Sequence, residues 1–302
     1  LTHTVERAVD AEDLGYHRFW VAEHHGVPGI ASGSPAVLLA AIGERTQRIR
    51  LGSGGVMLPH HQPLVVAEQF LLLAGLHPGR IDLGVGRSLG FTEPVRKALR
   101  RSVEEPDTFA DDIAELRDFL EGNAPVTARP MVEETIPLFV LATGRGLAVA
   151  AELGLPVVVG GPVLDDPALP EKLAGYRNSF RSHRDSRPRV TVSLDVLVAD
   201  TDAEARDLAL PEVWAMAQSR RTGSFGALEP VSAIRGKLRD DRHRDRIEQA
   251  LDRVTSGDAQ TVHRRLKQLV ERSGADELLV SGSTYDRDAL AASDAAVAGL
   301  LR

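Results

Sequence analysis

The stretch RIRLGSGGVMLPHHQPLVVAEQFLLLAGLHPGRIDLGVGR, residues 48–87, contains a strand, a helix and a second strand in direct succession. Residues 48–58 and 80–87 are short, largely apolar segments of the kind that form buried parallel strands. Between them, Pro63 marks the first turn of a helix that places Val66, Phe70 and Leu73 on its inward face. A strand–helix–strand unit of this kind predicts a parallel α/β fold.

The same alternation continues in both directions along the chain. The expected strands are 16–24, 48–58, 80–87, 136–142, 155–161, 189–199 and 277–282. The expected helices include 63–76, 93–102, 108–121, 146–153, 168–181, 202–218, 259–273 and 287–301. Because residue 1 lies inside a helical pattern, we expect one further strand before it, which makes eight. The sequence thus predicts a single (β/α)8 TIM barrel over residues 1–302. An open doubly wound sheet is the alternative, weakened because no G-x-G-x-x-G follows an early strand.

Two further segments, the helix that begins after Ser34 and residues 219–257, allow more detailed predictions. Ser34 and Pro35 open a helix that carries Val37, Leu38, Ala41 and Ile42 on one face. Residues 219–257 fit no barrel unit, and we interpret them as a solvated, partly helical insertion. The alternative is a mobile lid over the site.

The composition excludes several classes of protein. The chain has 302 residues, 43% of them hydrophobic, with a net charge of −7 and no cysteine. The acidic balance argues against a nucleic-acid-binding surface. No apolar run reaches the ~18 residues of a membrane span. The lack of cysteine excludes disulfides and thiolate metal sites and suits the reducing cytoplasm.

In a barrel of this kind the active site lies at the carboxyl ends of the strands. The expected ends carry Glu23-His24-His25 and the segments 52–61, 84–90 and 141–146. Polar and glycine-rich ends that converge on one face predict a pocket for a sizeable anionic ligand.

The segment ATGRG, 142–146, is a candidate phosphate site. Thr143 offers a hydroxyl, Arg145 a positive charge, and Gly144 and Gly146 allow close approach at a helix start, where free N–H groups attract anions. Arg87 adds a cation at the end of a neighbouring strand. The alternatives are a glycine-rich turn with a surface arginine, and a salt bridge on the barrel rim for Arg87.

Glu23, His24 and His25 raise the question of a metal. Zinc sites combine His with Glu or Asp, but neighbours on a strand point to opposite faces, so His24 and His25 do not readily share one ion. His60 and His61 meet the same restriction. We therefore predict no metal and favour one inward imidazole in proton transfer. A hydrogen-bonded structural histidine is the alternative.

Gly54 and Gly55 interrupt a strand that is otherwise rich in branched residues. Glycine weakens a strand unless something flat or bulky must approach it. Ligand access and a plain bulge are both open at this point.

Several of these stretches resemble the bacterial luciferase-like flavin monooxygenases. They are GYHRFWVAEHHGVPGIASGSPAVLLAA (15–41), RIRLGSGGVMLPHHQPLVVAEQF (48–70), LHPGRIDLGVGR (76–87), AAELGLP (150–156) and SGDAQTVHRRLKQLVERSGADELLVSGSTYD (256–286). The E-H-H strand end followed by G-S-G-G-V-M-L-P is the specific combination.

The resemblance implies a fold, a cofactor and a reaction. The fold is a (β/α)8 barrel, and the cofactor is reduced FMN delivered by a separate flavin reductase. O2 adds to the flavin C4a, and the peroxyflavin oxidises a small organic substrate.

The resemblance also implies residue roles. His24 transfers a proton near the flavin, and Glu23 and His25 orient it. Gly54 and Gly55 lie against the isoalloxazine, where the family often has a cis peptide. The phosphate contacts fall on Arg87, Thr143, Gly144, Arg145 and Gly146.

Two departures keep rivals open. The chain has GRSLGFTEP, 86–94, where many relatives have G-R-A-P-G-T-D, and ATGRG holds less serine than the usual phosphate loop. A deazaflavin-dependent dehydrogenase is one rival, although Glu23 favours FMN. A non-catalytic luciferase-type partner subunit is the other, although Arg87 is retained.

The resemblance further implies a homodimer. It would form through the helices after the second and third strands of the barrel, counting the expected strand before residue 1 as the first. Tailoring of a natural product and oxidation of a long-chain aldehyde are candidate reactions.

Overall fold

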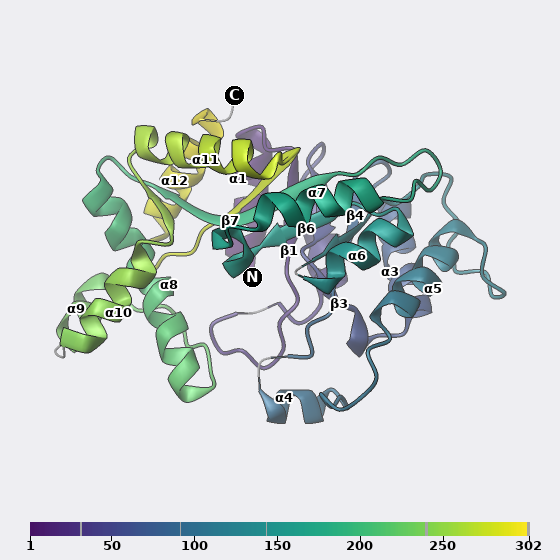
Figure 1. Ribbon diagram of the computed structural model, residues 1–302, viewed down its shortest axis with the longest axis horizontal. Coiled ribbons are helices and arrows are strands. Elements are labelled where there is room, and N and C mark those ends of the chain that lie inside the picture. Colours follow the sequence, from purple (N-terminus) through teal and green to yellow (C-terminus); the bar gives the residue numbers. More distant parts are fainter. Residues whose placement is uncertain (31, 91, 143, 239–240, 301–302) are drawn as a thin grey trace. The chain divides into compact units, whose positions relative to one another are not determined.

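The computed structural model (Figure 1) describes residues 1–30, 32–90, 92–142, 144–238 and 241–300. The chain divides into two compact units. Unit 1 comprises Leu1–Gly26, Ser32–Val159 and Val163–Val190. Unit 2 comprises Val27–Ala31, Gly160–Pro162 and Thr191–Arg302.

Unit 1 contains a parallel sheet. Its strands are β1 (Arg18–Val21), β2 (Arg50–Ser53), β3 (Val56–Met57), β4 (Ile81–Gly86), β5 (Leu138–Leu141) and β6 (Val157–Gly160). Their order is β1-β2-β4-β5-β6, and β3 also pairs with β4. Val21 is aligned with Ser53, Met57 with Gly86, and Leu141 with Val158. The carboxyl ends of these strands therefore lie along one edge, where the sequence places the site.

Helices surround this sheet in the predicted alternation. They are α1 (Thr2–Asp13), α2 (Pro35–Gly43), α3 (Pro63–Leu76), α4 (Glu93–Ala98), α5 (Phe109–Glu121), α6 (Arg145–Leu153) and α7 (Leu169–Ser179), with short 3-10 turns η1 (Leu58–His60) and η2 (Gly161–Asp165). Pro63 begins α3 as predicted, and Val66, Phe70 and Leu73 are buried. α3 packs beside α5 (Figure 1).

The four residues predicted to share one face of α2 are not equally buried. Ile42 is fully buried and Leu38 is half-buried, but Val37 is 71% exposed, Ala41 is exposed as well, and Leu39 is buried instead. Every residue of α2 is apolar or small, so the hydrophobic pattern did not distinguish its two faces. The outer face of α2 is consequently apolar.

The predicted strand 48–58 is divided at Gly54 and Gly55, whose peptide bond is cis, as the resemblance implies. A Cβ on Gly55 would lie 2.8 Å from the carbonyl oxygen of Gly84 in β4. At Gly52 it would lie 2.4 Å from Nε1 of Trp20. Glycine at these positions therefore allows close packing between strands, in addition to any ligand access.

A buried charged cluster joins β1, β2 and β4. Asp82 is fully buried and accepts hydrogen bonds from Arg18 (2.5 Å), Trp20 Nε1 (3.2 Å) and Arg50 (2.6 Å). A buried carboxylate is tolerated only with such partners. We therefore assign these residues to the structure of the sheet.

Unit 2 is built around β7 (Val190–Val198), which pairs in parallel with β8 (Thr255–Gly257) and β9 (Glu277–Ser281). Its helices are α8 (Asp202–Thr222), α9 (Val231–Lys237), α10 (Asp241–Leu251), α11 (Ala259–Ser273) and α12 (Arg287–Leu300). Asp258 caps α11, accepting from the N–H of Thr261 at 2.7 Å.

Residues 219–257 contribute more ordered structure than the sequence indicates. They hold the end of α8, all of α9 and α10, and the unpredicted strand β8. α9 and α10 pack against α8 (Figure 1), and Ile234, Ile247 and Leu251 are buried there with Trp214. Their role as a lid stays a prediction.

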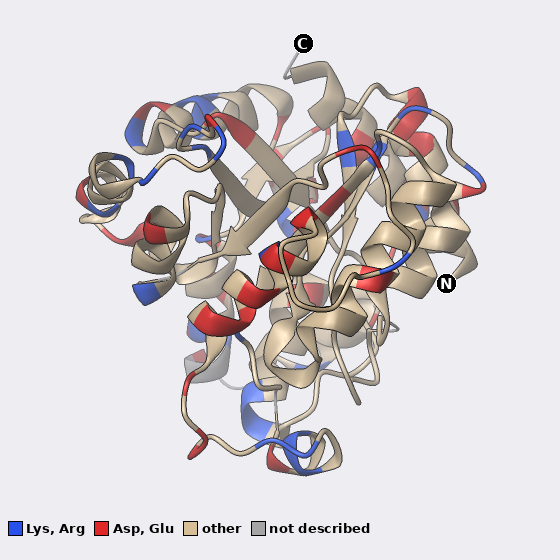
Figure 2. Cartoon of the chain, turned by 90° about the vertical axis from the view of Figure 1, so that its right-hand side faces the viewer, with Lys and Arg blue, Asp and Glu red and all other residues tan. Residues whose placement is uncertain are grey.

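Figure 2 shows acidic and basic residues interspersed over the helices and loops. Among the described residues, no helix combines the length and the apolar character that a membrane span requires.

Candidate functional site

Glu23, just beyond the end of β1, is the centre of a hydrogen-bonded cluster. Its side chain is buried, and Oε1 accepts from Nε2 of His25 at 2.6 Å and from Nε2 of His61 at 2.8 Å. Its Oε2 accepts from the N–H of Met57 at 2.8 Å. Glu23 thus connects the end of β1 with β3 and with the residue that follows η1.

The charge state of Glu23 determines which ring nitrogen of His25 and of His61 carries a proton. Burial alone would raise the pKa of Glu23, but hydrogen bonds from His61, the Met57 N–H and His25 outweigh it and lower the pKa. An ionised carboxylate only accepts hydrogen bonds, so both imidazoles carry a proton on Nε2. In their neutral forms, Nδ1 of His25 and His61 is then an acceptor.

His24 is not hydrogen-bonded to the Glu23 cluster in the part of the chain that the structure describes. Its backbone N–H donates to the carbonyl of Ser32 at 2.8 Å, while its Nδ1 is buried and has no partner among the described residues. Burial lowers the pKa of His24, although the charge of Glu23 opposes this. His24 therefore presents a neutral ring with an unpaired nitrogen, which is the condition of a group that awaits a ligand or water.

His60 is a site residue that the sequence reasoning did not assign. Both of its ring nitrogens are buried without a partner among the described residues. Its ring packs edge to face against the ring of His25, with 6.4 Å between the ring centroids. Burial lowers the pKa of His60 as well. The available signal was the position of His60 and His61 shortly after the predicted strand 48–58, at the same edge as Glu23.

The glycine pair follows β2 at the same edge of the sheet. Gly54 follows β2 and donates its N–H to the carbonyl of Val21 at 2.8 Å. A Cβ on Gly54 would come within 3.3 Å of the Trp20 ring. The end of β1 and the glycine pair are therefore held together by the backbone.

The candidate phosphate residues occupy the next two strand ends. Arg87 follows β4, and its guanidinium lies 3.3 Å from Asp107, with both side chains about half exposed. Such a pair is weak and leaves the cation accessible. Gly144 precedes α6 with φ of 57°, Arg145 begins the helix, and Gly146 is buried in its first turn. Thr143 lies outside the described residues.

The described contacts join Glu23 directly to His25, but they do not join either residue to Arg87 or to Gly144–Gly146. Those residues share the same edge through the strand register. Nor is a hydrogen bond found between His24 and Glu23 or His25 in the described part of the chain. Over the same residues, no group of three or more His, Cys, Asp or Glu side chains is arranged to hold a metal ion.

Known proteins resemble this chain over most of its length. Residues 1–277 match the family described as luciferase-like monooxygenase. A luciferase-like monooxygenase of Escherichia coli strain K12 is 37% identical over 294 residues, covering 95% of this chain and 87% of that protein. An N-acetyl-S-alkylcysteine monooxygenase of Bacillus subtilis strain 168 is 44% identical over 192 residues, covering 61% of this chain and 57% of that protein.

Solved structures agree in fold. The crystal structure of apo-MsnO8 is 31% identical with a TM-score of 0.87, covering 99% of this chain and 91% of that one. At 19% identity, the oxygenating constituent of 3,6-diketocamphane monooxygenase in complex with FMN has a TM-score of 0.73, covering 98% of this chain and 91% of that one. An F420-dependent secondary alcohol dehydrogenase, 16% identical, has a TM-score of 0.71, covering 100% of this chain and 95% of that one. These matches confirm the predicted barrel class, and the chain belongs to the luciferase-like monooxygenase family of oxidoreductases.

Proposed function

We propose that the protein is an FMN-dependent monooxygenase that uses reduced flavin and O2 to oxidise a small organic substrate. The observation that supports this most is His24, a neutral imidazole whose buried Nδ1 has no partner among the described residues. His24 follows β1 and the glycine pair follows β2, at the same edge of the sheet. A buried unpaired nitrogen costs about 1–3 kcal/mol, which a bound ligand would recover.

The residues at this edge fit FMN. The phosphate would be held by Arg87 and by the first N–H groups of α6, which follow Gly144 and have the positive end of the helix dipole behind them. The flat ring would lie over Gly54 and Gly55, which have no side chains to obstruct it. Thr143 and Arg145 complete the proposed phosphate contacts.

The protein's own part in the reaction is proton transfer and positioning. When bound, reduced flavin would supply two electrons and the C4a carbon to which O2 adds. His24 would hold and release a proton at Nδ1. Glu23 fixes His25 and His61 through their Nε2–H groups, so it keeps the ring orientations next to His24 constant.

The same proposal includes partners. A flavin reductase in the cytoplasm would supply reduced FMN. A homodimer would form through α2 and α3, which pack together and expose four large apolar side chains. Those side chains are Val37 at 71%, Val65 at 44%, Leu72 at 55% and Leu76 at 55% exposure.

Among the possible substrate classes, a thioether is supported by the name of one relative. The relative named for N-acetyl-S-alkylcysteine is 44% identical over its matched 192 residues. An N-acetyl-S-alkylcysteine is therefore the first compound to test, followed by long-chain aldehydes and natural-product precursors.

A deazaflavin-dependent dehydrogenase is the second candidate, favoured by the fold match to the F420-dependent alcohol dehydrogenase. A binding titration separates the two. The protein is titrated anaerobically with reduced FMN, reduced riboflavin and a reduced deazaflavin cofactor, and binding is measured by calorimetry. We expect FMN to bind at least about tenfold more tightly than riboflavin, because only FMN carries the phosphate.

Variants locate the phosphate contact. Arg87→Gln should remove most of the preference for FMN over riboflavin. Arg253→Gln, at an exposed arginine of unit 2, is the matched control and should leave it intact. Equal affinity of the wild type for FMN and riboflavin would contradict the proposal, and tighter binding of the deazaflavin would replace it with the second candidate.

A further inference from the structure

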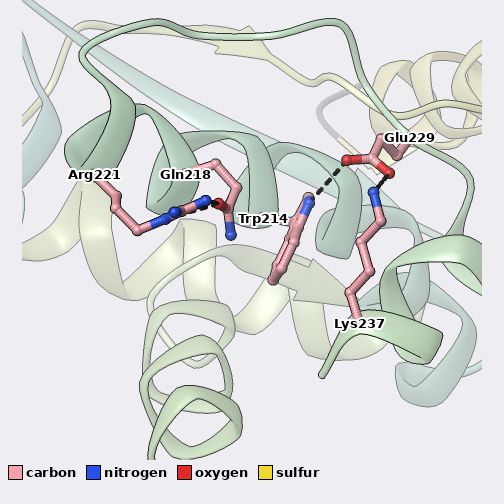
Figure 3. A pocket seen from close by; sticks show the side chains of 5 residues that line it. All are labelled: Trp214, Gln218, Arg221, Glu229 and Lys237. Atoms are coloured by element: carbon pink, nitrogen blue, oxygen red, sulfur yellow. Dashed lines mark hydrogen bonds and ion pairs between the residues drawn. The ribbon is translucent and has the colours of Figure 1, made fainter. Parts of the chain in front are cut away.

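Unit 2 contains a hollow of about 620 Å³ that has no part in the flavin site proposed above. It is lined by Trp214, Gln218 and Arg221 of α8, by Glu229 just before α9, and by Lys237 at the end of α9. Figure 3 shows Gln218 and Arg221 on one side of Trp214, and Glu229 and Lys237 on the other. Its volume lies in the range of about 300–1,000 Å³ typical of small-molecule sites.

On the side of the hollow formed by Glu229 and Lys237, the two opposite charges are paired with each other. Oε1 of Glu229 accepts from Nε1 of Trp214 at 3.1 Å, and Oε2 accepts from the ammonium group of Lys237. These hydrogen bonds, that from Lys237 first, lower the pKa of Glu229, so it is ionised at neutral pH. The carboxylate and the ammonium therefore cancel each other's charge.

The opposite side carries the positive charge of Arg221, which no described carboxylate neutralises. Nε and one terminal nitrogen of Arg221 donate to Oε1 of Gln218 at 3.2 and 2.7 Å (Figure 3). Gln218 is a neutral acceptor, and no carboxylate pairs with Arg221 in the described part of the chain. The guanidinium is thereby held in place at one end of the hollow while keeping its full positive charge. The two cations and one carboxylate of the lining leave a net charge of +1.

The middle of the hollow is apolar. Trp214 belongs to the buried core of unit 2 with Leu210 and Ile234, so its indole is a fixed surface rather than a mobile side chain. Rigid aromatic surfaces of this kind contact apolar or aromatic parts of ligands. A ligand that satisfies the whole hollow therefore needs an anionic head and an apolar body.

We propose that this hollow is a binding site for an organic monoanion, such as a carboxylate or sulfonate, whose head pairs with Arg221 and whose body lies along Trp214. A planar carboxylate matches the fork of the guanidinium. The proposal requires neither flavin nor O2, so its failure and that of the proposed function are distinguishable.

Decanoate is a suitable probe, with decanol and decyltrimethylammonium as neutral and cationic probes of similar chain length. Binding to the flavin-free protein is measured by calorimetry and by quenching of tryptophan fluorescence. Decanoate should bind saturably and quench the fluorescence, and Trp214→Phe should remove the quenching. Decanol and decyltrimethylammonium should bind at least about tenfold more weakly.

Charge variants test the position of the head group. Arg221→Gln should weaken decanoate binding at least about tenfold. Arg220→Gln, at the exposed neighbour outside the lining, should leave it unchanged. Arg221→Glu should reverse the order, so that decyltrimethylammonium binds better than decanoate. The proposal is overturned if Arg220→Gln and Arg221→Gln weaken binding equally, or if decanoate binds without saturation up to about 5 mM.

Discussion

Removing the Glu23 side chain should destabilise the protein far more than removing its charge alone. In Glu23→Ala the Met57 N–H loses its acceptor inside the protein, and His25 and His61 each lose a charged acceptor. A buried orphaned N–H costs about 1–3 kcal/mol and each lost bond to a partly exposed ring about 1 kcal/mol, giving about 3–5 kcal/mol in all. For a chain of this size, roughly 2 °C per kcal/mol converts this into a melting temperature about 6–10 °C lower.

Glu23→Gln should cost less because the two imidazoles can adapt. The amide oxygen can still accept from Met57, and neutral His25 and His61 can shift their protons to Nδ1 and accept from the amide NH2. We therefore expect a loss of about 1–2 kcal/mol, or roughly 2–4 °C.

The assay is thermal unfolding followed by circular dichroism, with Glu133→Ala and Glu133→Gln as exposed controls. The reasoning is refuted if the two Glu23 variants melt at the same temperature, or if neither differs from its control by more than about 1 °C.

Further predictions follow from single contacts. Gly55→Ala should destabilise the protein by about 1–3 kcal/mol in denaturant unfolding, because its Cβ would press on the β4 backbone, whereas Gly175→Ala in α7, with open space around it, should not destabilise. The stabilisation from Glu23 should be complete above about pH 4.5 and be lost as the pH falls through its lowered folded-state pKa, so acid titration of Glu23→Gln should give a flatter stability curve. Leu72→Glu should halve the mass measured by light scattering while Val126→Glu, also exposed, does not, and an unchanged mass would remove α3 from the dimer interface.

Local sequence signals predicted much of the fold because they act within a few residues. Pro63 begins α3, as the sequence indicates. Gly122 ends α5 in the left-handed conformation and Asp258 caps α11, and both residue types are common at these positions. The misses are elements that depend on tertiary packing. The short strand β8 forms by pairing with β7, and α4 ends at Ala98, two residues before Arg100 takes a φ of 57°.

In the candidate site, too, some features follow from local sequence and others depend on tertiary packing. Alternation along the predicted strand 16–24 separates His24 from His25. In the structure β1 ends at Val21, so both histidines lie beyond the strand, and of the two only His25 is hydrogen-bonded to Glu23 in the described part of the chain. The bond from His61 to Glu23 spans 38 residues, so no local pattern indicates it. It exists because the end of β1 and the residues after β3 meet at one edge of the sheet.

Oxygen reactivity of reduced FMN on the protein tests the central claim most directly. Reduced FMN is mixed anaerobically with the protein, O2 is added by stopped flow, and absorbance is followed from the first milliseconds. We predict a long-lived spectrum that belongs to neither reduced nor oxidised FMN, with a shorter lifetime in His24→Ala than in the wild type. Oxidation of reduced FMN at the rate seen in buffer alone, with no such spectrum, would contradict the assignment.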